Sequence, residues 1–357
     1  MVLRYQYRVA WLSPYDLSLD LLFLVFVAGV LIARAIERRG PAGAGRIVLR
    51  AAVVGVVLVL AIVASEYGAR FVFRNVRSSG NTGDFIGRRG GGPPIAVNSL
   101  GFRDREVPPK GDRFRIAVVG DSFTWGQGIE AGERFSNLLE GFLGPKYEVF
   151  NFGIPGDNLP EHLMVLERAL PTSPDFVLLQ LYINDFETPR MERPSSYPLL
   201  PGSMNDQLIA SSLLYDLLSN QWNQLQAALG ISETYPEYMA AHLRNPASPD
   251  SQEAFGMLRQ FIENCRKAHV GVGIVLFPAP DAMGPHGANY PFGYLHDRVR
   301  QVCTDERAPY LDLLPAFSSY ANPRSMWVTP FDAHPNAMAN KRAAYEMLAA
   351  FSGLWRR

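Results

Sequence analysis

The chain has 357 residues, of which 48% are hydrophobic, 19% charged and 11% aromatic, and this composition excludes a disordered or collagen-like protein. Its 34 basic and 34 acidic residues cancel, but residues 1–113 carry 16 Lys and Arg against 8 Asp and Glu, which leaves 18 against 26 for the remainder. A basic front joined to an acidic globular part argues against a nucleic-acid-binding protein, whose positive charge belongs on the folded domain.

Two apolar runs, at residues 21–33 and 51–64, lie near the beginning of the chain. With their flanks they predict a hairpin of two transmembrane helices, at about 17–36 and 47–65, because each then reaches the roughly 20 residues that cross a bilayer. The alternative is a pair of buried core helices, or a signal peptide for the first run. Residues 1–16 precede the first span and no small-residue cleavage site follows it, so we expect the hairpin.

The short loop between the two spans is basic, with arginines within or beside it at positions 34, 38, 39, 46 and 50. Cytoplasmic loops carry such an excess, so we expect this loop in the cytoplasm and residues 66–357 outside it. Arginines also flank the opposite ends of the spans, which makes the asymmetry incomplete. The 30 Arg against 4 Lys indicate a GC-rich genome and hence a bacterium, with the hairpin in its inner membrane and the soluble domain in the periplasm.

A segment rich in Gly, Ser, Asn and Arg, residues 67–95, predicts a linker after the hairpin. From residue 114 onwards, short apolar runs alternate with amphipathic stretches. We expect strands at 114–119, 147–151, 175–181, 270–277 and 309–313, and helices at 134–143, 159–170, 252–267, 294–302 and 335–351. This alternation predicts an α/β domain with a parallel sheet covered on both faces, in which ligands bind beyond the carboxyl ends of the strands.

One connection in this domain is unusually long, residues 187–249. It is proline-rich at first and then holds a helical stretch at about 208–229. A connection of this length indicates a lid or a binding surface, and a passive surface insertion is the alternative.

Four short polar motifs lie where predicted strands end or where the last helix begins. Gly120-Asp121-Ser122 exposes a hydroxyl at a strand-to-helix turn, the place where a serine nucleophile is useful. A glycine loop at 151–156 follows the second strand and permits close backbone approach, and Asn184-Asp185 follows the third. In the motif at 332–336, Pro335 suits the first position of a helix, so we expect His334 at a helix start. Each motif alone is also typical of an ordinary turn or a structural histidine.

Taken together and in this order, the four motifs resemble the four blocks of the SGNH/GDSL hydrolase family. The resemblance spans about residues 114–352. Residues 98–103 are also similar to a segment that precedes the first strand in extracytoplasmic members, so the hydrolase domain is expected at 96–357, with the lid-like insertion at 187–249. The family implies a flavodoxin-like three-layer α/β/α fold with about five parallel strands.

The resemblance also implies roles for individual residues. Ser122 would be the nucleophile, His334 the base, and Asp332 the acid that orients the imidazole. The backbone N–H groups of Ser122 and Gly156, with the side-chain amide of Asn184, would form the oxyanion hole.

One departure from the family concerns the acid. The commonest spacing is Asp-x-x-His, whereas Asp332 lies only two residues before His334. Asp312, at the end of the fifth predicted strand, is the reserve candidate. Asp121, by the same resemblance, is a structural neighbour of the nucleophile.

No metal or cofactor is expected. The other histidines, at 162, 242, 269, 286 and 296, lack metal-ligand spacing, and no nucleotide-binding loop follows a strand. Cys265 and Cys303 are too few for a disulfide scaffold, and one disulfide or two buried thiols both remain open.

We therefore expect a membrane-anchored serine esterase that works through an acyl-Ser122 intermediate, on O-acylated cell-envelope glycans or lipids. With a sugar hydroxyl as acceptor, the same site would be an O-acyltransferase. The alternative from another class is a non-catalytic subunit that uses this fold to dock in, or stabilise, a larger membrane protein complex. The intact Ser122, Asn184 and His334 favour the enzyme.

Overall fold

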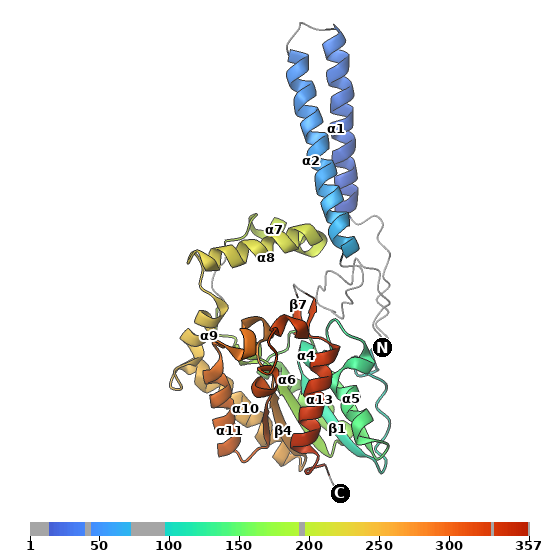
Figure 1. Ribbon diagram of the computed structural model, residues 1–357. Helices are drawn as coiled ribbons and strands as arrows, with labels where there is room; N and C mark the ends of the chain where they lie inside the picture. The colour runs from blue at the N-terminus through green and yellow to red at the C-terminus, as the bar shows by residue number, and fades with distance from the viewer. Residues whose placement is uncertain (1–13, 40–43, 73–96, 193–196, 330–331, 356–357) are drawn as a thin grey trace.

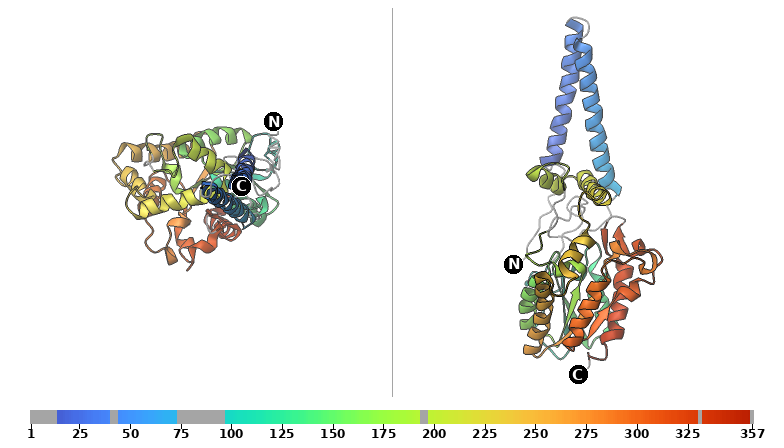
Figure 2. Two further views of the ribbon diagram at one scale, coloured as in Figure 1. Left: turned by 90° about the horizontal axis from the view of Figure 1, so that it is seen from above. Right: turned by 90° about the vertical axis from the view of Figure 1, so that its left-hand side faces the viewer.

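A computed structural model describes residues 14–39, 44–72, 97–192, 197–329 and 332–355 (Figure 1). A hairpin of two long helices stands away from an α/β domain, and two helices of the long insertion lie across the end of the hairpin, between it and that domain (Figures 1 and 2). The N-terminal segment before residue 14 and most of the expected linker fall outside the described residues.

The centre of the α/β domain is a sheet of five parallel strands in the order β2-β1-β3-β4-β5. The strands are β1 Phe114–Gly120, β2 Tyr147–Gly153, β3 Phe176–Leu181, β4 Gly271–Leu276 and β5 Tyr310–Asp312. All five expected strands are present within a few residues of their predicted bounds. This strand order is the flavodoxin-like one, so the predicted fold class is confirmed.

Helices cover both faces of the sheet. Ile116 and Val118 of β1 point into one apolar core and Ala117 and Val119 into the other, because neighbouring residues of a strand face opposite sides. The first core is closed by α5 Phe135–Leu143 and α13 Ala337–Phe351, and the second by α6 Leu159–Ala169, α10 Pro249–Lys267 and α11 Gly293–Asp305. The result is the expected three-layer arrangement (Figure 1).

Short elements complete the domain. The short helices are α4 Ser122–Trp125, α12 Leu314–Phe317, η1 Ala131–Glu133, η2 Leu170–Thr172, η3 Ile183–Phe186, η4 Pro280–Ala282, η5 Pro285–Gly287 and η6 Pro323–Met326. A separate antiparallel pair is formed by β6 Trp327–Thr329 and β7 Asp332–Pro335.

Cys265 and Cys303 are both free and buried, so the disulfide alternative is wrong.

The hairpin consists of α1 Pro14–Arg39 and α2 Ala44–Val72, both longer than the expected spans. Residues 67–72, assigned to the linker from the sequence, are therefore helical. Within the described residues, one segment, Leu49–Ala69, is long and apolar enough to cross a membrane, and the apolar part of α1 is shorter, Leu21–Ile32. Only 17% of the α2 segment is buried, which separates it from the core helices of water-soluble proteins.

Within its described residues, the insertion holds three helices, α7 Gly202–Ser211, α8 Leu213–Ala228 and α9 Tyr235–Leu243. The helical stretch expected at about 208–229 is present, and it is divided between α7 and α8, which are separated at Ser212. Ser212 has extended backbone angles, and its hydroxyl accepts a hydrogen bond from the N–H of Tyr215, so it caps α8 and cannot continue α7.

Candidate active site

The site lies where the strand order of the sheet reverses. In the sheet, β1 lies between β2 and β3. The chain leaves β1 toward β2 and leaves β3 toward β4 on the opposite side, so the two segments diverge at the carboxyl ends of β1 and β3. Parallel sheets leave a crevice at such a position. Ser122 follows β1 and Asn184 follows β3, and both line a cavity of about 850 Å³ there.

The turn after β1 presents the Ser122 hydroxyl. Asp121 caps the short helix α4, since its carboxylate accepts a hydrogen bond from the N–H of Phe123 over 2.9 Å. A residue with a side chain would not fit at position 120, because its Cβ would lie 2.2 Å from the Thr124 hydroxyl oxygen. That hydroxyl and the Thr124 N–H both donate to the side-chain oxygen of Gln180 on β3, which joins α4 to the neighbouring strand.

The segment at 98–103, which the sequence analysis identified, contacts the C-terminal end of the same short helix. The Arg103 guanidinium donates to the carbonyl oxygens of Trp125 and Gly126 over 3.0 and 2.6 Å, and to that of Ile129 over 2.8 Å. These carbonyls lie at or just beyond the C-terminus of α4, where cations are favoured. The position of Ser122 is thus held by contacts at both ends of α4.

The pair β6–β7 carries the histidine. His334 and Asp332 lie in β7, and the expectation of His334 at a helix start is wrong. Asn336 takes the capping role because its side-chain oxygen accepts from the N–H of Ala339, so α13 begins only at Ala337.

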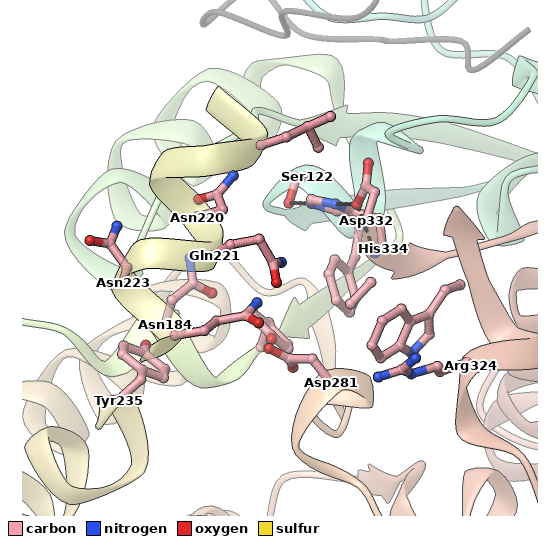
Figure 3. A pocket seen from close by; sticks show the side chains of 16 residues that line it. Ser122, Asn184, Asn220, Gln221, Asn223, Tyr235, Asp281, Arg324, Asp332 and His334 are labelled. Carbon is pink, nitrogen blue, oxygen red and sulfur yellow. Dashed lines mark hydrogen bonds and ion pairs between the residues drawn. The ribbon is translucent and has the colours of Figure 1, made fainter. Parts of the chain in front are cut away.

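The structure brings the serine, the histidine and the aspartate together (Figure 3). His334 Nε2 lies 2.9 Å from Ser122 Oγ, although the two residues are 212 positions apart in the chain. His334 Nδ1 lies 2.5 Å from Asp332 Oδ1, which also accepts from the His334 backbone N–H over 3.0 Å. The ring of Phe123 packs edge-on against the imidazole and limits its rotation.

The charge of Asp332 determines the tautomer of this histidine. Burial opposes ionisation of the carboxyl, but the hydrogen bonds and the charge of His334 outweigh it and lower the pKa of Asp332. An ionised carboxylate only accepts hydrogen bonds, so His334 Nδ1 carries the proton and Nε2 is free to accept the Ser122 hydroxyl proton. The reserve acid Asp312 is engaged elsewhere, because it lies 2.8 Å from His296 Nδ1.

Two of the three expected oxyanion donors belong to residues that line the cavity, and the third does not. Ser122 is the first residue of α4, and Asn184 lies in η3 and lines the cavity. Gly156 lies in an exposed turn with φ +84° and is outside the residues that line the cavity.

The opposite wall of the cavity comes from the insertion. α8 contributes one apolar and four amide side chains to the lining: Leu217, Asn220, Gln221, Asn223 and Gln224. The rest of the lining is also largely polar or aromatic, and includes Tyr182, Tyr235, Asp281, Arg324 and Trp327 (Figure 3). Burial raises the pKa of Asp281, which hydrogen bonds and the charge of His334 partly oppose.

The sequence of residues 118–342 matches the GDSL-like lipase/acylhydrolase family. The chain belongs to this family. The predicted resemblance to this family is therefore confirmed.

One curated relative of this chain is an acetylxylan esterase of Xylanibacter ruminicola, 34% identical over 99 residues. That match covers 25% of this chain and only 21% of the relative. Similar solved structures include TesA, with 16% identity and a TM-score of 0.43 over 67% of this chain and 99% of that one. The acetylxylan esterase Axe2 from Geobacillus stearothermophilus has 15% identity and a TM-score of 0.43, over 69% and 98%.

A cluster of two buried aspartates and a buried histidine lies next to the candidate site. Asp121, Asp185 and His162 are all fully buried, and His162 Nε2 lies 3.4 Å from an Asp185 oxygen. Burial, followed by the charge of Asp185, raises the pKa of Asp121 to about 7. Burial likewise raises the pKa of Asp185 and lowers that of His162. Each group is thus shifted toward its neutral form, as expected where water is excluded.

Several lining residues were missed by the motif reading. The residues that α8 contributes could have been predicted from the sequence, because they recur at helical spacing and so share one face of a helix: Leu217, Gln221 and Gln224, and likewise Asn220 and Asn223. They also lie in a segment too long to be a simple connection. Asp281 follows the fourth strand, so its position at the carboxyl edge was also readable. Arg324 and Trp327 lie in a segment with no motif, and only the tertiary structure brings them to the site.

Proposed function

We propose that this protein is a membrane-anchored serine esterase that removes a small acyl group from a hydroxyl-rich substrate through an acyl-Ser122 intermediate. The observation that carries the proposal is the chain of contacts from Asp332 through His334 to the Ser122 hydroxyl, at the wall of a polar cavity. Nucleophile, base and orienting acid are within bonding reach in the order that acyl transfer requires.

The proposed reaction has two halves. The Ser122 oxygen attacks the ester carbonyl carbon while His334 Nε2 takes the hydroxyl proton, and Asp332 stabilises the imidazolium that forms. The tetrahedral intermediate collapses, His334 returns the proton to the leaving alcohol, and the acyl group stays on Ser122. Water, deprotonated by His334, then attacks the acyl carbon and releases the acid and the free serine.

The negative oxygen of the intermediate requires donors that are already in place. We assign this role to the backbone N–H of Ser122 and the side-chain amide of Asn184, which lie at the carboxyl ends of adjacent strands. The N–H of Gly156 stays the third predicted donor, and its exposed turn would have to approach the substrate.

The lining of the cavity supports a glycan-like alcohol. Amides, a carboxylate and an arginine are suited to hydroxyl groups, and Trp327 offers an aromatic surface for a sugar ring. A long aliphatic acyl chain would require an apolar channel, so we propose an acetyl or similarly small acyl group. The acetylxylan esterase relative is consistent with this class of substrate.

The hairpin supports the membrane part of the proposal. The Leu49–Ala69 segment spans about 31 Å at 1.5 Å per residue, which matches the roughly 30 Å hydrocarbon core. Large apolar side chains on both helices are exposed, among them Leu24, Leu31, Val57 and Leu58, a surface that is costly in water and suited to lipid. The arginines expected in the cytoplasm lie at the far tip of the hairpin, and we propose that the α/β domain is periplasmic.

A fluorophosphonate probe tests the serine chemistry on the full chain in detergent. We expect covalent labelling that disappears in Ser122→Ala, together with release of acetate from p-nitrophenyl acetate and from acetylated xylo-oligosaccharides. Absence of labelling in a well-folded protein would favour the non-catalytic subunit. Acetyl groups transferred to an added sugar, in place of free acetate, would identify an acyltransferase.

A further inference from the structure

The wall that α8 contributes to the cavity is attached to the membrane hairpin. α8 packs mainly against α7 and against α2, rather than against the sheet or its covering helices. Figure 2 shows α7 and α8 lying across the end of the hairpin, on the side that faces the α/β domain. The helix that lines the substrate cavity is therefore supported from the membrane side.

The carboxylate of Glu66 hydrogen bonds to the start of α8. Glu66 of α2 is fully buried, and its carboxylate accepts hydrogen bonds from the Ser212 hydroxyl over 2.8 Å and from the N–H groups of Leu213 and Leu214 over 3.1 and 3.0 Å. These are the first N–H groups of α8, which have no partner within the helix. A negative charge is favoured at this end of a helix.

Glu66 is an unusual residue for its position. It lies within the apolar segment Leu49–Ala69, three residues from its end, where a carboxylate without partners is expensive. The start of α8 supplies three donors to the two oxygens of that carboxylate, so the charge and the helix end satisfy each other. The contact joins two segments 146 residues apart in the chain.

The same helix then reaches the site. Asn220 and Gln221, at the middle of α8, line the cavity two turns beyond the end that Glu66 holds. Because an α-helix is stiff over such a distance, fixing its first turn fixes the place of these amides relative to Ser122.

We propose that Glu66 is a positioning residue that holds α8 as the substrate-binding wall, so that the membrane hairpin is a structural part of the active site as well as an anchor. This inference rests on the proposed function, because it assigns a binding role to the α8 amides. The chemistry at Ser122 does not depend on Glu66, whereas recognition of the alcohol part of the substrate does.

The test uses the full chain in detergent micelles and two esters of the same acyl group. For Glu66→Ala we expect KM for acetylated xylo-oligosaccharide to rise about tenfold or more, while kcat/KM for p-nitrophenyl acetate stays within about twofold. Glu66→Gln keeps one acceptor oxygen, so its KM for acetylated xylo-oligosaccharide should lie between those of the wild type and of Glu66→Ala. Glu263→Ala, which removes an exposed carboxylate on α10, is the matched control and should leave both esters unchanged.

Amide hydrogen exchange supplies a second readout that requires no substrate. We expect exchange in residues 213–217 to accelerate at least tenfold in Glu66→Ala and to stay unchanged in the sheet. Unchanged exchange there would overturn the proposal, and so would equal losses on both esters. If the wild type fails to label with fluorophosphonate, the esterase function fails, and the exchange measurement still decides whether Glu66 holds α8.

Discussion

The acid at position 332 offers the sharpest test of the site, because its spacing departs from the common one. Asp332→Asn keeps the size of the side chain and removes its charge. The variant can still accept from the His334 backbone N–H, so the β7 strand should remain intact. What it loses is the carboxylate that stabilises the imidazolium formed during acyl transfer.

The size of that loss follows from the geometry. Two unit charges about 4 Å apart interact by roughly 4 kcal/mol at an effective dielectric constant of 20. The Asp332 side chain is 25% exposed, so solvent screens part of this and about 3 kcal/mol remains. Each 1.36 kcal/mol is a factor of ten in rate, so we expect kcat to fall about 10²- to 10³-fold.

The assay is hydrolysis of p-nitrophenyl acetate by the full chain, with fluorophosphonate labelling as a measure of the serine alone. Asp312→Asn is the control, because Asp312 pairs with His296 and lies outside the Ser122–His334–Asp332 chain. Its kcat should stay within about threefold of the wild type. The reasoning is refuted if Asp332→Asn keeps a kcat within about fivefold, or if Asp312→Asn has the larger effect.

Three further perturbations test other parts of the structure. Asn184→Ala should lower kcat about 10²-fold without changing the melting temperature, and a normal kcat would exclude its amide from the oxyanion hole. Asp121→Asn keeps the helix cap but cannot ionise. Because the folded-state pKa of Asp121 is about 7 against an ordinary 3.8, the stability conferred by its proton is present at low pH and is lost as pH rises through about 7. The variant should therefore match the wild type in melting temperature near pH 4 and exceed it at pH 8.5; a pH-independent difference would contradict this. Gly55→Ala places a Cβ 2.2 Å from the Phe26 ring and should destabilise the hairpin by about 1–3 kcal/mol, whereas Gly29→Ala, with 3.8 Å to its nearest neighbour, should not. Equal urea-unfolding midpoints for the two glycine variants would show that this helix contact does not matter.

Much of the α/β domain was readable from the sequence, because its signals are local. Each strand is a continuous apolar run with turn residues at its end, as for residues 114–119, and each covering helix repeats its apolar residues at helical spacing. Parallel strands place their carboxyl ends at one edge, so Ser122 and Asn184 were expected to meet there. The apolar runs at 21–33 and 51–64 likewise predict long helices by composition alone.

The errors in the expectations arose where two local signals compete. Pro335 and Asn336 both suit a helix start, and the structure uses Asn336, which leaves His334 in a strand. Ser212 lies inside the helical stretch expected at about 208–229, and its capping hydroxyl divides that stretch into two helices.

The sequence by itself determined the order of strands and helices, the motifs at the strand ends and the apolar character of the hairpin. Only the tertiary structure decided that His334 of β7 reaches the Ser122 hydroxyl, that the amides of α8 form a wall of the cavity, and that Glu66 caps that helix. The physical reason is distance along the chain. Propensity and periodicity act over a few residues, whereas these contacts join residues far apart, and their partners are chosen by the packing of the whole molecule.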